Sequence, residues 1–519
     1  MKKDNKTKNE KPALTRRQFL GVGLAAGTAV TLSGCGVVKD IGGSSGWVPE
    51  QYNTGGNWPP QVKGRVPLDP ENISVVRDDK KCVLCGQCLE VCQNVQTVYG
   101  SYELPVLDEF ICINCGQCAL WCPSGAITER SQIQQVKAAI DDPDKVVVVQ
   151  TAPSVRVGLG EAFGLPIGEW VEGQMVAGLR RLGFDVVFDT NFAADLTIME
   201  EGTELINRLT KGGALPQFTS CCPGWVKFVE IYYPDLIPNL STAKSPMSEQ
   251  GPLIKTYYAK TKKINPKNIV SVAIMPCVGK KFEADRPELN AAGKTYNIPD
   301  MRDTDFVLST RELADFMKME GIDLTALPEE KFDPLMGEGS GAGVIFGNTG
   351  GVMEAAVRTV YAVVSGTEPP DLLYDLQPVR GLEATKEAEL NVPGFGPVRV
   401  AVCSSLSAAR ALCDKVVAGE ANYHFIEVMT CPGGCISGGG QPKSTVPPDN
   451  RMRTPRTDSL YKRDATMAPE ARTSHKNTEI AKIYANFLGE PCGHMSHKLL
   501  HTHYTDRSEY LIPKKGGEA

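Results

Sequence analysis

The interpretation of this sequence depends on one stretch, Phe218-Thr219-Ser220-Cys221-Cys222-Pro223-Gly224-Trp225. Neighbouring side chains in extended backbone point to opposite sides, so adjacent cysteines seldom share one role. The proline fixes its own backbone angle, and the glycine lets another group approach the main chain closely. The stretch can therefore hold one thiolate on a metal while the other stays free beside it. For an arbitrary Cys-Cys pair, two buried cysteines that act as small apolar residues are the commoner alternative.

The composition favours iron–sulfur chemistry. The 519 residues are enough for about three domains, and their 42% apolar and 22% charged content is ordinary for globular proteins. The net charge of -6 gives no sign of a nucleic-acid partner. Seventeen cysteines in tight clusters indicate metal ligation, and with only six histidines thiolate is the expected ligand.

The amino terminus has the features of an export signal. Thr15-Arg16-Arg17-Gln18-Phe19-Leu20 leads into an apolar run over residues 21–32 that is too short to span a bilayer comfortably. The arginine pair resembles the twin-arginine signal, and Leu32-Ser33-Gly34-Cys35 resembles a lipoprotein cleavage box. We expect a signal over residues 1–35, a lipidated Cys35 that anchors the chain to a membrane, and a linker over residues 36–70. An ordinary cleavage near Cys35 is the alternative.

Two cysteine runs predict a ferredoxin domain over residues 71–140. Their doubled spacing is typical of bacterial ferredoxins with two [4Fe–4S] clusters, in which the fourth cysteine of each run binds the other cluster. One predicted cluster is bound by Cys82, Cys85, Cys88 and Cys122, and the other by Cys112, Cys115, Cys118 and Cys92. Gln93 stands where such a run usually has proline, and the strand-like residues 102–107 fit a connecting hairpin. The domain is expected to exchange electrons with a site elsewhere in the chain.

From Lys145 on, short apolar runs alternate with helical patterns, which predicts an α/β architecture with parallel strands. The predicted strands are residues 145–150, 184–188, 269–275, 398–402 and 423–429, and the predicted helices include residues 173–182, 195–209 and 350–364. Chemistry in such sheets lies at the carboxyl ends of the strands. Three of these ends carry Thr151–Ser154, Met275–Cys277 and Met429–Cys435.

Outside the ferredoxin runs, four thiolates could hold one more cubane cluster: Cys222, Cys277, Cys431 and Cys435. Residues 438–440 are glycines, which let backbone wrap tightly around a bulky group. In this arrangement Cys221 is a spare thiol able to exchange protons beside a redox centre. The remaining Cys403, Cys413 and Cys492 lack partners at ligand spacing and are expected to be core or incidental cysteines.

Three stretches, TSCCPGW (219–225), MPCVGKKFEADRPE (275–288) and EVMTCPGGCISGGGQP (427–442), together resemble the signatures of [FeFe]-hydrogenases. The resemblance runs from about Ser74 to about Arg507. It implies a two-lobed α/β catalytic domain over residues 145–447 with the active site between the lobes. It also implies a C-terminal segment over residues 448–519, a helical tail that is a separate small subunit in some periplasmic members.

The resemblance also implies the cofactor, the H-cluster. In that family a [4Fe–4S] cluster shares a cysteine with a di-iron unit that bears CO, cyanide and a dithiolate amine. The four thiolates above are expected to hold the cubane, with Cys435 as the bridge. Lys280 is expected to donate to one cyanide, and the segment Ala152-Pro153-Ser154 to serve the other through backbone at Pro153 and the Ser154 hydroxyl. Met275 and Met429 are expected to pack against the carbonyls as water-excluding walls.

Such an enzyme converts H2 reversibly into two protons and two electrons, and the protons need a route through a dry core. Family matching implies the order Cys221, Glu201, Ser241, Glu204 and Arg208. Independently, positions 201, 204 and 208 share one helix face. Without the family resemblance, a solvated, salt-bridged face is the commoner explanation of that spacing. Burial can shift the pKa of a thiol or a carboxyl group and make it a useful proton carrier.

Near the carboxyl end, residues 478–489 predict an amphipathic helix, and four histidines lie between His494 and His503. Four histidines so close together could form a metal site, but the resemblance to the family's C-terminal tail favours a structural role.

The leading hypothesis is an exported hydrogenase, fitted with its di-iron unit by maturation proteins, that oxidises H2 and passes electrons to a periplasmic cytochrome or a membrane electron-transfer partner. The alternatives are a non-catalytic hydrogen sensor or iron–sulfur scaffold, or a ferredoxin-linked reductase with one extra cubane. Cys221, commonly changed in sensors, is present, and Lys280 and the glycine run have no role in a plain reductase.

Overall fold

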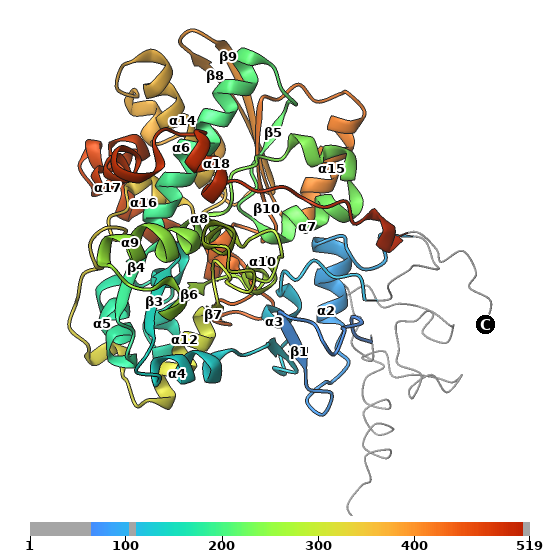
Figure 1. Ribbon diagram of the computed structural model, residues 1–519. Helices are drawn as coiled ribbons and strands as arrows, with labels where there is room; N and C mark the ends of the chain where they lie inside the picture. The colour runs from blue at the N-terminus through green and yellow to red at the C-terminus, as the bar shows by residue number, and fades with distance from the viewer. Residues whose placement is uncertain (1–63, 103–109, 512–519) are drawn as a thin grey trace, which may run out of the picture. The chain divides into compact units, whose positions relative to one another are not determined.

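The computed structural model describes residues 64–102 and 110–511 (Figure 1). These fall into two compact units, one with Gly64–Val66 and Cys82–Gly86 and the other with Pro67–Lys81 and the residues from Gln87 on. In the first unit a parallel bridge joins Gly64 to Cys85. All the helices and strands below belong to the second unit. The predicted signal, Cys35 and most of the linker and connecting hairpin lie outside the described residues.

The second unit begins with the cysteine-rich region. Strand β1 (Val75–Arg77) pairs antiparallel with β2 (Ile127–Glu129). Between them lie α2 (Gln87–Glu90), which continues into a π-helical turn over Val91–Val95, and α3 (Gln117–Leu120). Helix α4 (Ile133–Ile140) then leads to the large α/β part.

The first large sheet has four parallel strands in the order β4-β3-β6-β7. Their bounds are β3 Val146–Thr151, β4 Val186–Asp189, β6 Ile269–Met275 and β7 Phe306–Ser309. Alternate residues of β3 enter different cores: Val147 and Val149 pack with α5 (Glu172–Leu182) and α12 (Thr310–Met319), whereas Val148 packs with α6 (Thr190–Lys211). Both faces are therefore covered, which explains the nearly continuous apolar runs.

The second large sheet has the order β5-β10-β9-β8. Its strands are β5 Gln217–Phe218, β8 Thr385–Val392, β9 Gly396–Ser404 and β10 Phe425–Met429. One face packs against α7 (Pro223–Tyr232) and α15 (Leu406–Val417), and the other against α14 (Gly351–Ser365) and α6. Helix α6 thus contributes to cores on both sheets (Figure 1).

Each of the five predicted strands is present and pairs in parallel with a neighbouring strand, whereas β8, which the sequence did not predict, runs antiparallel to β9. Strand β8 alternates buried and exposed residues at the sheet edge, and β5 spans only two residues, so neither has the apolar run of a buried strand.

The C-terminal segment packs on the α/β part through three helices, α16 (Asn450–Ala465), α17 (Thr478–Ile483) and α18 (His494–Leu500). The predicted helix over residues 478–489 is α17 with a π-helical turn at Tyr484–Leu488. The remaining helices are α8 Pro246–Leu253, α9 Ala259–Lys262, α10 Gly279–Ala284, α11 Ala291–Tyr296 and α13 Gly341–Ile345. Within residues 64–102 and 110–511, none of the helices combines the length and the apolar character needed to cross a membrane.

Candidate active site

A cavity lies where strands of both large sheets end. It contains about 830 Å³ of space outside protein atoms, counting its open side. Its walls come from residues that follow β3, β5, β6 and β10. This position is the one expected for chemistry in α/β sheets.

The four cysteines predicted to hold a cubane all line this cavity: Cys222, Cys277, Cys431 and Cys435. The thiols interact with one another, and burial together with the neighbouring thiols raises the pKa of Cys277 to about 12. A crowded group of thiols in such a cavity keeps its protons unless a metal replaces them, so this donor set fits an iron–sulfur cluster.

Two polar residues that the sequence did not single out contact these sulfurs. Thr430 donates its backbone N–H to Cys222 Sγ at 3.4 Å, and its Oγ1 accepts from the same thiol at 3.1 Å. Gln117 Nε2 donates to Cys431 Sγ at 3.1 Å and to the Ser437 carbonyl oxygen at 2.8 Å. Neither contact has a local sequence signal, because each joins elements far apart in the chain.

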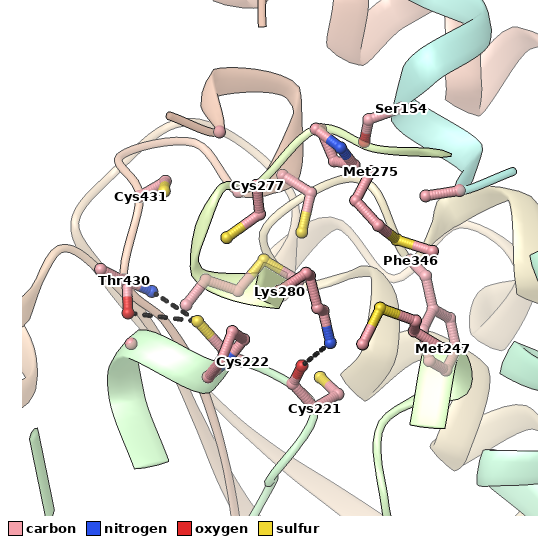
Figure 2. Close-up of a pocket in the computed structure, with 18 of the residues that line it drawn as sticks. Ser154, Cys221, Cys222, Met247, Met275, Cys277, Lys280, Phe346, Thr430 and Cys431 are labelled. Atoms are coloured by element: carbon pink, nitrogen blue, oxygen red, sulfur yellow. Dashed lines mark hydrogen bonds between the residues drawn. The ribbon is translucent and has the colours of Figure 1, made fainter. Parts of the chain in front are cut away.

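Cys221 and Lys280 lie together at the same cavity, as Figure 2 shows. Lys280 Nζ donates to the Cys221 carbonyl oxygen at 3.0 Å and to Glu283 Oε2 at 2.7 Å. Burial disfavours the ammonium, but the Glu283 carboxylate keeps the pKa of Lys280 above its ordinary value. Burial also raises the pKa of the Cys221 thiol, with a further contribution from the negative charge of Glu201. The site thus combines a fixed cation with a thiol that holds its proton.

The opposite side of the cavity combines apolar walls with one unsatisfied hydroxyl. Within the described residues Ser154 Oγ has no hydrogen-bond partner although it is fully buried, while the Ser154 carbonyl oxygen accepts from Gln441 at 2.8 Å. Ala152, Pro153, Met275 and Met429 line the cavity as expected, and Met247 and Phe346 do so as well. An orphaned hydroxyl beside thioether walls suits a bulky, weakly polar group that accepts a few hydrogen bonds.

Gly438 of the glycine run lines the cavity, and the run also allows two stretches of backbone to pack closely together. A Cβ at Gly438 would meet the Pro276 carbonyl oxygen at 2.2 Å, and one at Gly439 would meet the Cys115 carbonyl oxygen at 2.4 Å. These glycines allow backbone to pack against backbone, and they bring the Cys115 loop against the cavity wall. Cys115 itself lines the cavity.

Four of the ferredoxin-type cysteines also lie close enough to interact electrostatically: Cys92, Cys112, Cys115 and Cys118. Cys88 lies near them on α2. Burial opposes ionisation of Cys122, but backbone N–H groups, Ser124 and Lys443 lower the pKa of its thiol. Cys82 and Cys85 are partly buried and belong to the first unit.

The predicted relay residues begin with Glu201 on α6, close to Cys221. Glu201 is almost fully buried, and the Ser241 hydroxyl and the Ser220 backbone N–H lie close enough to its carboxyl group to oppose the rise of its pKa. Burial and the nearby Glu204 raise the pKa of Glu201 to about 8. The group can therefore exist in both protonation states near neutral pH.

Glu204, Ser241 and Arg208 form a connected set of hydrogen bonds. Ser241 Oγ donates to Glu204 Oε2 at 2.8 Å, and Arg208 Nη2 donates to Glu204 Oε1 at 2.7 Å. Arg208 is also held by several carbonyl oxygens, among them that of Leu240 at 2.7 Å. The Glu204 and Arg208 side chains are 14% and 11% exposed, so the set reaches towards the surface.

Comparison with known proteins places this site in a family. A family model described as "Iron only hydrogenase large subunit, C-terminal domain" matches residues 145–439, and one described as "Iron hydrogenase small subunit" matches residues 450–507. The chain is 46% identical over 456 residues to the NADP-reducing hydrogenase subunit HndD of Solidesulfovibrio fructosivorans, covering 84% of this chain and 75% of that protein. It is 47% identical over 381 residues to the periplasmic [Fe] hydrogenase large subunit of Nitratidesulfovibrio vulgaris, covering 72% of this chain and 88% of that protein.

A solved structure of a variant of apo [FeFe]-hydrogenase HydA1 from Chlamydomonas reinhardtii matches with a TM-score of 0.64 and 45% identity, covering 72% of this chain and 99% of that one. A more distant relative, cytosolic iron-sulfur assembly component 3 of Rattus norvegicus, is 32% identical over 386 residues, or 72% of this chain and 77% of that protein. The chain belongs to the family of iron-only, or [FeFe], hydrogenases, oxidoreductases that act on H2.

Proposed function

We propose that this protein interconverts H2 with two protons and two electrons at an H-cluster held in the cavity. The observation that carries the proposal is the composition of that cavity. Four neighbouring thiols, the spare thiol of Cys221, the cation of Lys280 and the Ser154 hydroxyl surround one space. Such a donor set fits a cubane joined to a second metal group that has few protein bonds.

Cys222, Cys277 and Cys431 would bind the cubane, and Cys435 would bridge it to the di-iron unit. When bound, the di-iron unit supplies the metal and base that cleave H2. Lys280 would donate to one cyanide of that unit, and Ser154 Oγ with backbone at Pro153 to the other. Met275, Met429 and Met247 would exclude water from its carbonyl side. The two four-stranded sheets would form the two lobes on either side of the site.

Protons would leave through residues that the sequence placed in a relay. Cys221 passes its proton to Glu201, which burial keeps able to exchange protons near neutral pH. Ser241 joins the next carboxyl group, Glu204, by its hydrogen bond of 2.8 Å. Arg208, fixed by backbone carbonyl groups, then orients Glu204 at the partly exposed end. In H2 evolution the same groups act in reverse order.

Electrons would move through the cysteine-rich region. Cys92, Cys112, Cys115 and Cys118 would hold one [4Fe–4S] cluster, and the close approach of the Cys115 loop to Gly439 supports transfer between this cluster and the cavity. The spacing of the cysteines still assigns the other cluster to Cys82, Cys85, Cys88 and Cys122. The proposed domains keep the predicted bounds, 71–140 for the ferredoxin domain, 145–447 for the catalytic domain and 448–519 for the C-terminal segment.

The arginine pair and Cys35 support export by the twin-arginine route and a lipid anchor at the outer face of the cytoplasmic membrane. There we propose H2 oxidation, with a periplasmic cytochrome or a membrane electron-transfer partner as acceptor. Maturation proteins would install the di-iron unit before export.

The test is infrared spectroscopy of the matured protein, together with H2-dependent dye reduction. Bands from metal-bound CO and cyanide with dye reduction support the proposal. Iron–sulfur absorbance without those bands after full maturation contradicts it and favours the alternative of a non-catalytic sensor, scaffold or electron carrier.

A further inference from the structure

We propose that Glu200, Cys492 and His501 form a binding site for one divalent ion of the zinc class, which fastens the C-terminal segment to helix α6. The site shares no ligand with the cavity or the relay, although Cys492 lies close enough to Glu204 to be affected by its charge. It uses a buried carboxylate, a thiol and an imidazole that the hydrogenase function leaves without a role. The proposal does not depend on the H2 reaction.

The three potential ligand atoms converge from distant parts of the chain. The carboxylate, the thiol sulfur and one imidazole nitrogen all lie within 4.8 Å of one another. His501 Nε2 is 3.0 Å from Glu200 Oε2, and the Cys492 thiol lies 3.4 Å from the Glu200 carbonyl oxygen. A tetrahedral zinc ion, with bonds of about 2.0–2.3 Å, brings its ligand atoms to roughly 3.5 Å of each other, so small side-chain rotations suffice.

The surrounding hydrogen bonds orient the ligands as in metal sites. His501 Nδ1 is 2.8 Å from Thr242 Oγ1, which leaves Nε2 facing Glu200. An imidazole that binds a metal usually has its other nitrogen fixed in this way. Tyr484 donates its hydroxyl to Glu200 Oε1, and the Cys492 backbone N–H donates to Glu200 Oε2 at 2.6 Å. These contacts fix the carboxylate before any ion arrives.

The ligand types select the ion. One sulfur, one nitrogen and one oxygen donor are typical of zinc sites, whereas magnesium and calcium prefer oxygen donors alone. Glu200 is fully buried and the His501 side chain is 4% exposed, so these ligands are shielded from water. A water molecule can complete four-coordination. Binding releases the thiol proton of Cys492.

The site has a mechanical consequence. Glu200 belongs to α6, whereas Cys492 and His501 flank α18 in the C-terminal segment. The segment already contacts the chain beside the relay through the bridge between Ala243 and His501. An ion bound here joins the two parts by metal–ligand bonds. The neighbouring Glu201, which faces Cys221, is not among the ligands.

The experiment measures zinc in the full-length holoprotein after equilibration with Zn²⁺, by elemental analysis and by X-ray absorption at the zinc edge. We expect one zinc per chain, with one sulfur ligand at about 2.3 Å and nitrogen or oxygen ligands at about 2.0–2.2 Å. Cys492→Ser and His501→Gln should lose this zinc, and Thr242→Val should weaken its binding about 10- to 100-fold. Cys413→Ser, which changes another buried cysteine outside the clusters, should bind as the parent does.

Iron content and cluster absorbance of every variant establish that it is folded and loaded. Two results overturn the proposal: a parent protein without tightly bound zinc, or a Cys492→Ser variant that keeps the zinc with the same number of sulfur ligands. Since the readout is a metal count and ligand set, the result does not depend on whether H2 is consumed.

Discussion

A buried carboxylate at the contact surface between α6 and the C-terminal segment and a buried hydroxyl at the cavity have different hydrogen-bond environments. At the contact surface, Asp195 accepts hydrogen bonds from the Ser340 backbone N–H and hydroxyl and from Ser474 and Asn477. At the cavity, Ser154 Oγ lacks any hydrogen-bond partner within the described residues.

The difference indicates a structural role for Asp195 and a cofactor-binding role for Ser154. A buried polar atom without a partner costs about 1–3 kcal/mol, whereas a satisfied one costs little. The carboxylates at the contact surface are satisfied and hold segments together. The unsatisfied Ser154 hydroxyl at the cavity is free to donate a hydrogen bond to a cofactor. The predictions below test this contrast, from the largest expected effect to the smallest.

Replacing Cys221 should have the largest effect on catalysis. Cys221→Ala removes the first proton carrier and should reduce H2 uptake about 100- to 10,000-fold, the usual contribution of general acid–base catalysis. The cluster ligands remain, so iron content and CO and cyanide bands should persist. Cys413→Ala, a buried cysteine in the α15 core, is the matched control and should keep its activity. A Cys221→Ala enzyme within a few fold of the parent would exclude the relay.

Replacing Asp195 should act on stability instead. Asp195→Ala leaves four buried donors without their acceptor and should lower the free energy of unfolding by about 2–4 kcal/mol. We expect a lower melting temperature but near-parental H2 uptake per loaded cluster at low temperature. Asp195→Asn, which keeps one acceptor oxygen, should lower the free energy of unfolding by a smaller amount. Equal melting temperatures for all three proteins would show that the contact is not stabilising.

The pH dependence of catalysis should report Glu201. Its pKa is about 8, and it must be ionised to accept a proton from Cys221. H2 oxidation should therefore increase as the pH rises through about 8, while H2 evolution should decrease. Steady-state rates in both directions between pH 6 and 9 check this, and a flat profile would assign the pKa to another group.

The same carboxyl group should make stability depend on pH. The pKa of Glu201 in the folded state is raised above the ordinary value of 4.5. The contribution of this carboxyl group to stability is therefore fully present below pH 4.5 and is lost as the pH rises through about 8. Glu201→Gln resembles the protonated form and lacks this loss. Between pH 5 and 9, the free energy of unfolding of the variant should rise relative to that of the parent by up to about 4 kcal/mol. The rise is measurable as a growing difference in melting temperature. A difference that does not change with pH would contradict the buried, neutral state.

How much the sequence could predict follows from the same contrast. The cysteines at the ends of predicted strands, together with the three family signatures, predicted which thiols gather at the cavity. Helical periodicity placed Glu201 and Glu204 on α6. Long-range packing leaves no such trace: Met247 and Gln117 reach the site from α8 and α3, and neither lies in a recognisable motif. The two-residue β5 and the half-exposed β8 were missed because pairing with a neighbouring strand, not an apolar run of their own, holds them in the sheet.

Ser154→Ala should have the smallest effect on the protein and a specific one on the cofactor. The hydroxyl makes no hydrogen bond within the described residues, so its removal relieves an unsatisfied buried group. The melting temperature without the di-iron unit should stay the same or rise slightly. With the unit installed, the loss of one donor should shift a cyanide band and lower H2 uptake by about 10-fold or less, the value of roughly one hydrogen bond. Thr359→Ala is the control, since Thr359 also has a buried, unpartnered hydroxyl but does not line the cavity. An unshifted cyanide spectrum in Ser154→Ala would mean that the Ser154 hydroxyl does not contact the cofactor. The lack of a hydrogen-bond partner would then not distinguish a cofactor-binding group at the cavity from a structural group elsewhere.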